Sequence, residues 1–384
     1  MEAGLCRSQV SGGSPYQCEV FVPFLELVLH GIIMRRGPAR FNRPRERQCG
    51  CENRRFRPVS VQARPLRPAM RDLGSRLNRG SRGMLSEVIT EPSAVATIRL
   101  WPVGSPTQIT HDSPEVAYTV RDGVAAGTTF LRNVSDPTLS VFTPQHSNGI
   151  GIIVVPGGGW TINAWTHEGV DVARWLTTLG YTAFLLKYRV QASGSDQAAF
   201  EARMAAVDDT LAAGLEARRL PSEIGDLIST EAYLNARKAC ADDGRRAIEI
   251  VRSEAAQLGL RPGALGMIGF SAGAFLTVDV ALDPRGAPLS FIAPIYGGET
   301  RGASIPKDAP PLFTAVARDD ILVRIVEGLY AEWTAADRSA ELHIFARGAH
   351  GFGMIRQGLP SDHWTDLFSA WLDDLNLTGD STQS

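Results

Sequence analysis

The feature of this sequence that most restricts its fold is a series of short segments that are almost entirely apolar, such as GIIVVP, AFLLKY and FIAPIYG. Strands of this kind are buried on both faces, as in a parallel sheet covered by helices. Helical patterns lie between them, so we predict an α/β fold with a mostly parallel central sheet and helices on both faces. The predicted strands are 139–143, 151–156, 181–187, 264–270, 290–295, 312–317 and 341–346, and the predicted helices are 168–179, 242–258, 272–282, 322–336 and 363–375.

The charge of the chain divides it into two parts. Residues 1–84 carry 16 Arg, no Lys and 6 acidic residues, whereas residues 85–384 carry 23 basic and 35 acidic residues. An Arg-, Pro- and Gly-rich segment without periodicity cannot bury a core. We therefore predict a disordered extension over 1–84 and a folded domain over 85–384.

Three interpretations of the extension stay open. It is an arm that contacts nucleic acid, a targeting segment, or sequence upstream of a true start at Met84. Only two aromatic residues, Phe41 and Phe56, lie among the arginines of residues 35–83, so we do not expect nucleic acid as a partner.

Residues 191–240 interrupt the alternation of strands and helices with about fifty residues rich in Ala, Glu and Arg. Long insertions in compact domains are often lids or binding loops. A helical decoration far from any site is the alternative, and the sequence does not separate the two.

The cysteines and apolar runs indicate the compartment. Only Cys240 lies in the folded domain, so that domain does not depend on a disulfide. The longest apolar run, 20–34, is shorter than the roughly 20 residues of a membrane span and does not read as a secretion signal. We expect a cytoplasmic protein without a membrane partner. The pair Cys49 and Cys51 is too closely spaced for zinc, and we expect neither metal nor cofactor.

The pentapeptide GFSAG, residues 269–273, has the pattern G-x-S-x-G between an apolar strand and a helix. This is the context that a nucleophile elbow requires, so we predict Ser271 as a nucleophile. The backbone N–H of Ala272, at the start of the helix, is a candidate oxyanion donor. A serine that only caps a helix is the alternative interpretation.

A second glycine-rich stretch, PGGGW at residues 156–160, follows another apolar strand. Consecutive glycines expose backbone N–H groups and let a substrate approach closely. We predict Gly158 and Gly159 as further oxyanion donors and Trp160 as a wall of the acyl pocket. The stretch lacks the sequence of a phosphate-binding loop.

An acid and a base follow the nucleophile in the chain. Asp319 and Asp320 end the predicted strand 312–317, and either carboxylate could orient an imidazole while the other caps a helix. His350 lies in a Gly-rich loop after the strand 341–346. The order Ser, Asp, His favours His350 as the general base.

These motifs together resemble the α/β-hydrolase esterases related to bacterial acetylxylan esterases, which are often described as xylanase-like carbohydrate esterases. The resemblance covers about 98–375 and rests on VVPGGGW, GMIGFSAGAFL, AVARDDILV and LHIFARGAHGFG. It implies the α/β-hydrolase fold and selects Asp320 over Asp319, because the family aspartate precedes a short apolar pair and a valine. It also implies that His167–Gly169 lie beside the site.

The function implied by this resemblance is a serine esterase that removes acetyl or other short acyl groups from sugars through an acyl-enzyme. The expected partner is a small-molecule or saccharide ester, and the sequence does not indicate an oligomeric state. A general carboxylesterase or a small peptidase or amidase of the same fold is the alternative enzyme. A binding module that uses the Arg-rich arm is the alternative outside enzymes.

Overall fold

The computed structural model describes residues 94–377 apart from 102–108, 110–112, 122–124, 203–229 and 287. The predicted extension 1–84 and most of the predicted insertion 191–240 lie outside the described residues. Both predictions therefore stay predictions.

An eight-stranded sheet forms the centre of the protein, in the order β1-β4-β7-β5-β8-β9-β10-β11. The six strands β7, β5, β8, β9, β10 and β11 are parallel to one another, whereas β4 is antiparallel to both of its neighbours, β1 and β7. Their bounds are β1 Ala96–Arg99, β4 Thr138–Phe142, β5 Gly151–Val155, β7 Thr182–Lys187, β8 Leu265–Phe270, β9 Ile292–Ile295, β10 Leu312–Ala317 and β11 Ala340–Phe345.

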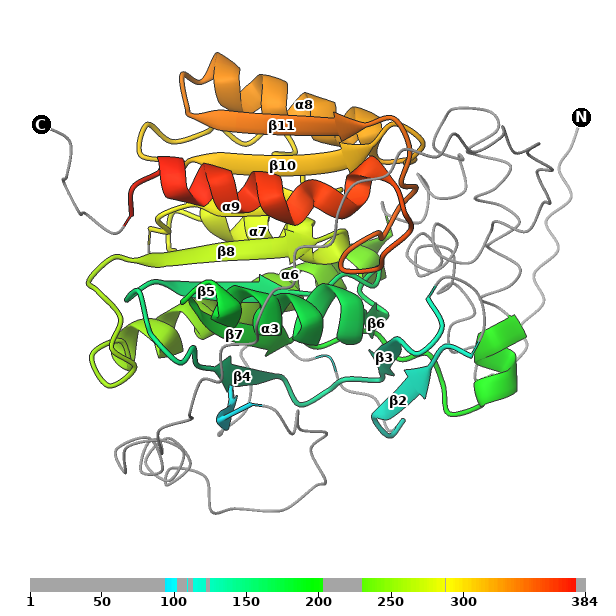
Figure 1. Ribbon diagram of the computed structural model, residues 1–384. Coiled ribbons are helices and arrows are strands. Elements are labelled where there is room, and N and C mark those ends of the chain that lie inside the picture. The colour runs from blue at the N-terminus through cyan, green and yellow to red at the C-terminus, as the bar shows by residue number, and fades with distance from the viewer. Residues whose placement is uncertain are drawn as a thin grey trace, which may run out of the picture.

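Helices cover both faces of this sheet (Figure 1). Helices α3 and α9 lie on the face toward the viewer, and α6 and α7 lie behind it. Trp175 of α3 packs on Trp364 of α9 with ring centroids 5.7 Å apart, which joins the two helices on one face. The helix bounds are α3 Asp171–Thr178, α6 Glu231–Ser253, α7 Ala272–Ala281, α8 Val323–Ala335 and α9 Trp364–Asp374, with a π-helical turn η2 at Thr166–Val170 and a 3-10 turn η3 at Pro360–His363.

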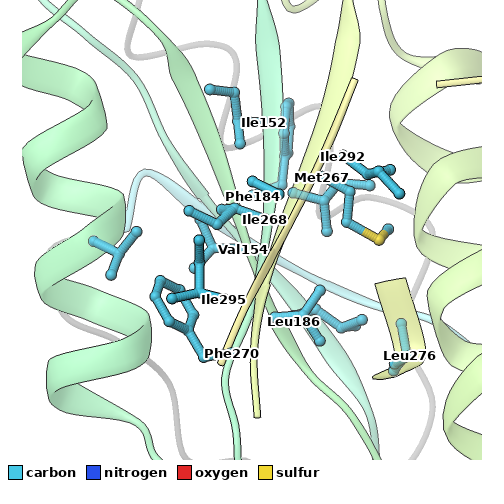
Figure 2. Close-up of a cluster of buried hydrophobic side chains, with 14 of the residues drawn as sticks. Ile152, Val154, Phe184, Leu186, Met267, Ile268, Phe270, Leu276, Ile292 and Ile295 are labelled. Atoms are coloured by element: carbon cyan, nitrogen blue, oxygen red, sulfur yellow. The ribbon is translucent and has the colours of Figure 1, made fainter. Parts of the chain in front are cut away.

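The central strands explain the continuous apolar segments of the sequence. Every residue of β5, β7, β8 and β10 is buried. Figure 2 shows the side chains that these strands send into the core, among them Ile152, Phe184 and Ile268. Full burial of one such side chain stabilises the fold by about 1.5–3 kcal/mol. The strand order and the two covered faces confirm the predicted α/β-hydrolase fold.

Four short strands were not predicted. β1 adds to the sheet edge, and β2 (Val116–Thr119), β3 (Thr129–Arg132) and β6 (Ile162–Asn163) form a separate three-stranded antiparallel sheet. Each has four residues or fewer, which is too short for a period-2 pattern to stand out.

Helix α6 begins at Glu231, earlier than the predicted start at residue 242. The side chain of Thr230 accepts the Tyr233 N–H at 3.3 Å and caps the helix. Two of its charged residues, Arg237 and Asp243, are buried in ion pairs. The buried face of α6 therefore lacks a continuous apolar pattern in the sequence. The end of the segment 191–240 is therefore the first part of α6.

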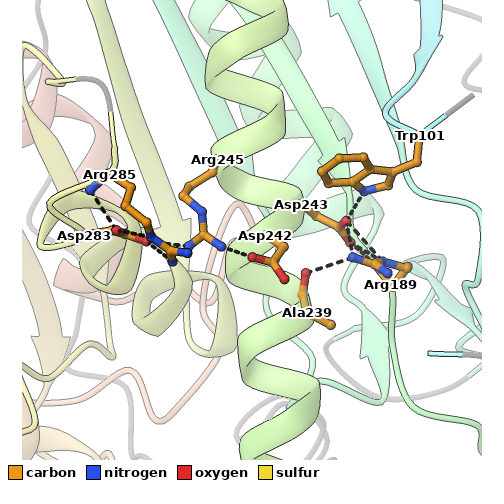
Figure 3. Close-up of polar contacts among 8 residues, drawn as sticks. All are labelled: Trp101, Arg189, Ala239, Asp242, Asp243, Arg245, Asp283 and Arg285. Carbon is orange, nitrogen blue, oxygen red and sulfur yellow. Dashed lines mark hydrogen bonds and ion pairs between the residues drawn. The ribbon is translucent and has the colours of Figure 1, made fainter. Parts of the chain in front are cut away.

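The Asp243 ion pair joins three parts of the chain (Figure 3). The Arg189 guanidinium, just after β7, donates to both Asp243 oxygens at 2.7–3.1 Å, and Trp101 Nε1 donates to Asp243 Oδ1 at 2.6 Å. Arg189 also donates to the Ala239 carbonyl at 3.1 Å. This buried network holds α6 against the end of β7.

No helix in the described part of the chain is long and apolar enough to cross a membrane.

Candidate active site

Ser271 lies at a sharp turn between β8 and α7, with φ 49° and ψ −115°. This conformation costs a non-glycine residue about 1–3 kcal/mol and is typical of functional turns. Its N–H donates to the Ile295 carbonyl at 3.0 Å. A Cβ on Gly269 would overlap the Gly273 carbonyl, and a Cβ on Gly273 would overlap the Val155 carbonyl. The two glycines of the pentapeptide are therefore required by close packing of strand, turn and helix.

The imidazole of His350 lies between Ser271 and Asp320. His350 Nε2 is 2.8 Å from Ser271 Oγ, and His350 Nδ1 is 2.8 Å from Asp320 Oδ2. This geometry suits the tautomer in which Nδ1–H donates to the carboxylate and Nε2 accepts the serine O–H. All three side chains are buried. The structure thus brings the three predicted residues into one continuous hydrogen-bonded row.

Two opposing influences act on the pKa of His350. Burial disfavours the charged ring and lowers the pKa, but the Asp320 carboxylate, with a contribution from Glu168, outweighs burial and leaves the pKa above its ordinary value. A carboxylate in this position stabilises the imidazolium that forms when the ring takes a proton.

The two adjacent aspartates have different contacts. Asp320 accepts the Leu322 N–H at 2.8 Å through its second oxygen, so it also caps the turn into α8. Asp319 Oδ1 accepts the N–H groups of Gly348 and Ala349 at 3.0 and 2.8 Å. Asp319 therefore fixes the histidine loop, residues 346–359, which carries His350. The sequence did not indicate this contact.

The glycine loop, residues 156–160, lies beside the elbow. A Cβ on Gly157 would lie 2.9 Å from Ser271 Cβ. Gly158 has φ 127° and Gly159 has φ 56°, and the Gly158 carbonyl accepts the N–H groups of Thr161 and Ile162, each at 3.0 Å. Such a tight loop needs glycine, because a Cβ on Gly158 would overlap the Ile162 carbonyl.

The three predicted oxyanion donors are backbone N–H groups of buried residues. Within the described residues, the N–H groups of Gly158, Gly159 and Ala272 donate to no protein acceptor. The Gly157 N–H is different, because it donates to Glu168 Oε2 at 2.8 Å. The assignment of the three free donors to an oxyanion hole stays a prediction.

Trp160, the predicted wall of the acyl pocket, is buried. Its ring packs edge-to-face on Tyr233 of α6 at 4.8 Å and lies 5.8 Å from the ring of Phe275 in α7. These contacts fix the end of the glycine loop against both helices. The role of Trp160 in substrate binding stays a prediction.

Two buried residues beside the hydrogen-bonded row, Tyr296 and Glu168, were not given a role by the sequence motifs alone. Tyr296, just after β9, donates its O–H to Glu168 Oε1 at 2.7 Å and accepts the Gly353 N–H at 3.1 Å. Burial raises the pKa of Glu168 to about 7. The family resemblance pointed to His167–Gly169, but nothing in the sequence singled out Tyr296. Its only signal is an aromatic residue at the end of an apolar strand.

The described part of the chain contains no group of three or more His, Cys, Asp or Glu side chains placed to hold a metal ion. Cys240 is buried in α6, and its Sγ contacts the Arg189 carbonyl at 3.0 Å.

Part of this chain is similar to a curated protein. No protein-family model matches the sequence. The acetylxylan esterase of Xylanibacter ruminicola is 24% identical over 262 residues, which cover 58% of this chain and 46% of that protein. The chain thus spans about half the length of the curated relative it matches.

Solved structures of hydrolases are also similar. The acetyl ester-xyloside bifunctional hydrolase of Caldicellulosiruptor lactoaceticus matches with 22% identity and a TM-score of 0.46, over 64% of this chain and 90% of that one. The thermophilic esterase Est2 of Thermogutta terrifontis matches with 16% identity and a TM-score of 0.45, over 65% of this chain and 91% of that one.

Proposed function

We propose that this protein is a serine esterase that hydrolyses short-chain esters, above all acetyl esters on carbohydrate, through an acyl-enzyme. The observation that carries the proposal is the buried hydrogen-bonded row from Ser271 Oγ through His350 to Asp320, with 2.8 Å at each step. A hydroxyl activated by a base that an acid orients is the arrangement of serine hydrolases.

Acylation begins when Ser271 Oγ attacks the carbonyl carbon of the ester and its proton passes to His350 Nε2. The carbonyl oxygen becomes an oxyanion, which the N–H groups of Gly158, Gly159 and Ala272 stabilise. Loss of one such donor costs about 2.7–4 kcal/mol in related sites. The bond to the alcohol then breaks, and His350 returns the proton to the leaving oxygen.

Deacylation repeats these steps with water as the nucleophile. His350 takes a proton from water as the water oxygen attacks the acyl carbon, and the bond to Ser271 Oγ breaks as the proton returns to it. The Asp320 carboxylate holds the ring with Nδ1–H toward its own oxygen throughout. The products are a carboxylic acid and the free serine.

Acetyl and carbohydrate enter the proposal from two sources. The motif resemblance is to acetylxylan esterases, and the curated relative carries that name. Backbone N–H groups can donate to the carbonyl oxygen of any acyl group, so these donors do not determine which alcohol the substrate carries.

The test is hydrolysis by the full chain of p-nitrophenyl acetate, butyrate and decanoate, of acetylated xylo-oligosaccharides, and of a peptide p-nitroanilide. We expect the highest kcat/KM on acetyl esters and acetate release from the oligosaccharides. The matched control is Ser271→Ala, which keeps the fold and removes the nucleophile. Preference for decanoate or for the anilide would overturn the substrate proposal, and equal turnover by the control would overturn the mechanism.

A further inference from the structure

We propose that Glu168 is a positioning residue of this site: its carboxylate fixes the glycine loop against the histidine loop, and its negative charge stabilises the imidazolium that His350 becomes during ester hydrolysis. The inference rests on the proposed function and deepens it. The carboxylate is a second buried acid beside the row, in addition to Asp320.

The contacts of Glu168 link the two loops through one tyrosine. Its Oε2 accepts the Gly157 N–H of the glycine loop at 2.8 Å, and its Oε1 accepts the Tyr296 O–H at 2.7 Å. The oxygen of Tyr296 in turn accepts the Gly353 N–H of the histidine loop at 3.1 Å. Displacement of this carboxylate would therefore move the oxyanion donors and the base relative to each other.

The local backbone around Glu168 supports the same link. Glu168 belongs to the π-helical turn η2, a rare form that is frequent at functional sites. The carbonyl of its neighbour His167 accepts the Met354 N–H at 2.9 Å, a second contact with the histidine loop. A Cβ on Gly353 would lie 2.7 Å from that carbonyl, so the loop approaches η2 closely.

The Glu168 carboxylate lies close to Ser271. A Cβ on Gly157 would lie 2.6 Å from Glu168 Oε2 and 2.9 Å from Ser271 Cβ, so both side chains border the same small space. The Tyr296 ring, which Glu168 holds by its hydroxyl, lies 5.1 Å from the His350 ring. Glu168 thus acts through backbone and ring neighbours, as a positioning residue does.

Of the ionisable groups near Glu168, His350 is the one that becomes positively charged during the reaction. Burial lowers the pKa of His167 to about 3, so that ring stays neutral. Burial raises the pKa of Tyr188 and Tyr296 well above their ordinary value, so both phenols stay protonated. Among the described residues, the positive charge that forms near Glu168 during the reaction is therefore that of His350.

Glu168 and His350 favour each other's charged form. Burial raises the pKa of Glu168, and the Tyr296 hydroxyl and the His350 ring partly oppose that rise. Glu168 in turn adds to the effect of Asp320 and raises the pKa of His350. Because the base must be neutral to take the serine proton, the acid limb of kcat/KM reports the pKa of the coupled Glu168–His350 pair. Removal of the Glu168 charge must lower it.

The experiment compares kcat/KM for p-nitrophenyl acetate from pH 5 to pH 9 in the wild type, Glu168→Gln and Glu168→Asp. We expect Glu168→Gln to move the acid limb to lower pH and to lower the plateau by about ten- to hundredfold, since the two loops lose their register. Glu168→Asp keeps the charge, so its acid limb should stay at the wild-type pH while its plateau falls.

An acid limb that stays in place in Glu168→Gln would overturn the inference, and so would a limb that moves equally in both variants. If Glu168→Gln does not fold, Tyr296→Phe decides. Tyr296→Phe keeps the aromatic ring beside His350 but removes the hydroxyl that favours the ionised form of Glu168. The acid limb of kcat/KM should therefore again move to lower pH. An acid limb that does not move would overturn the inference. A wild type that hydrolyses no ester would instead overturn the proposed function.

Discussion

Asp243 and Asp320 are both buried carboxylates that contact a basic side chain near the carboxyl ends of the central strands, yet their surroundings differ. Asp243 receives two nitrogens of Arg189 and the indole N–H of Trp101. A guanidinium stays protonated in proteins, so this cluster has no proton to move. Asp320 instead contacts His350, whose second nitrogen lies 2.8 Å from a hydroxyl. A guanidinium partner leaves a buried carboxylate with a structural role, whereas an imidazole partner allows it to assist proton transfer.

The largest effect expected from this comparison is on Asp320. Asp320→Asn should lower kcat/KM for p-nitrophenyl acetate by about 10⁴-fold, because the amide favours the wrong tautomer of His350. The free energy of unfolding should change little, since the new side chain has nearly the same shape. Steady-state kinetics and urea unfolding on the same preparation check both statements. Activity within tenfold of the wild type would contradict the assignment of Asp320.

Asp243→Asn should have the opposite profile. It leaves the Arg189 guanidinium buried without its counter-charge, which lowers the free energy of unfolding by about 3–5 kcal/mol. The activity of the folded protein should be unchanged, because the row at His350 is intact. The matched control is Glu327→Gln, which breaks the exposed pair with Arg324 and should cost less than about 1 kcal/mol. Similar losses in the two variants would remove the distinction.

The expected effect at Asp319 lies between those at Asp320 and Asp243, because Asp319 fixes the position of the histidine loop. Asp319→Ala leaves the Gly348 and Ala349 N–H groups without their acceptor, and the resulting shift of His350 should lower kcat/KM by up to about 10²-fold. A single oxygen accepts both N–H groups, so Asp319→Asn should retain most of the activity. Equal losses in the alanine and asparagine variants would contradict a positioning role.

The smallest expected effect is that of His167 on the pH dependence of the free energy of unfolding. It is buried with no hydrogen-bond partner for either ring nitrogen in the described structure, and burial lowers its pKa to about 3. The unfolded chain binds a proton here below about pH 6.5 and the folded protein does not, so stability should fall as the pH drops from 6.5 toward 3.

The variant His167→Gln should flatten this dependence by about 1.4 kcal/mol per pH unit, the effect of one proton. Urea unfolding at pH 7.5, 6 and 5 measures the slopes for both proteins. An identical slope in the variant would show that the ring is protonated in the folded state or that other groups dominate.

Much of the fold was predictable because its central strands carry a strong local signal. The predicted strand 312–317 coincides with β10, and 264–270 differs from β8 by one residue, because these segments are buried on both faces and contain few polar residues. The start of α6 was not predictable, because Arg237 and Asp243 are buried through ion pairs with residues distant in sequence.

The same distinction holds for the site. Ser271, Asp320 and His350 follow strand ends and carry recognisable motifs, so their proximity was expected. The roles of Asp319 and Tyr296 were not, since each acts through backbone N–H groups of the histidine loop, whose position no local pattern specifies. The sequence motifs predicted the three residues of the hydrogen-bonded row, and the tertiary structure showed which other groups contact the histidine loop.

The central claim is that Ser271 is the nucleophile, and covalent trapping tests it most directly. The full-length protein is incubated with a fluorophosphonate probe, and intact mass and peptide mapping locate the adduct. The account predicts one adduct per chain, on the peptide that contains Ser271, slower labelling in Asp320→Asn and none in Ser271→Ala. An adduct elsewhere, or an unlabelled wild type that still hydrolyses p-nitrophenyl acetate, would contradict it.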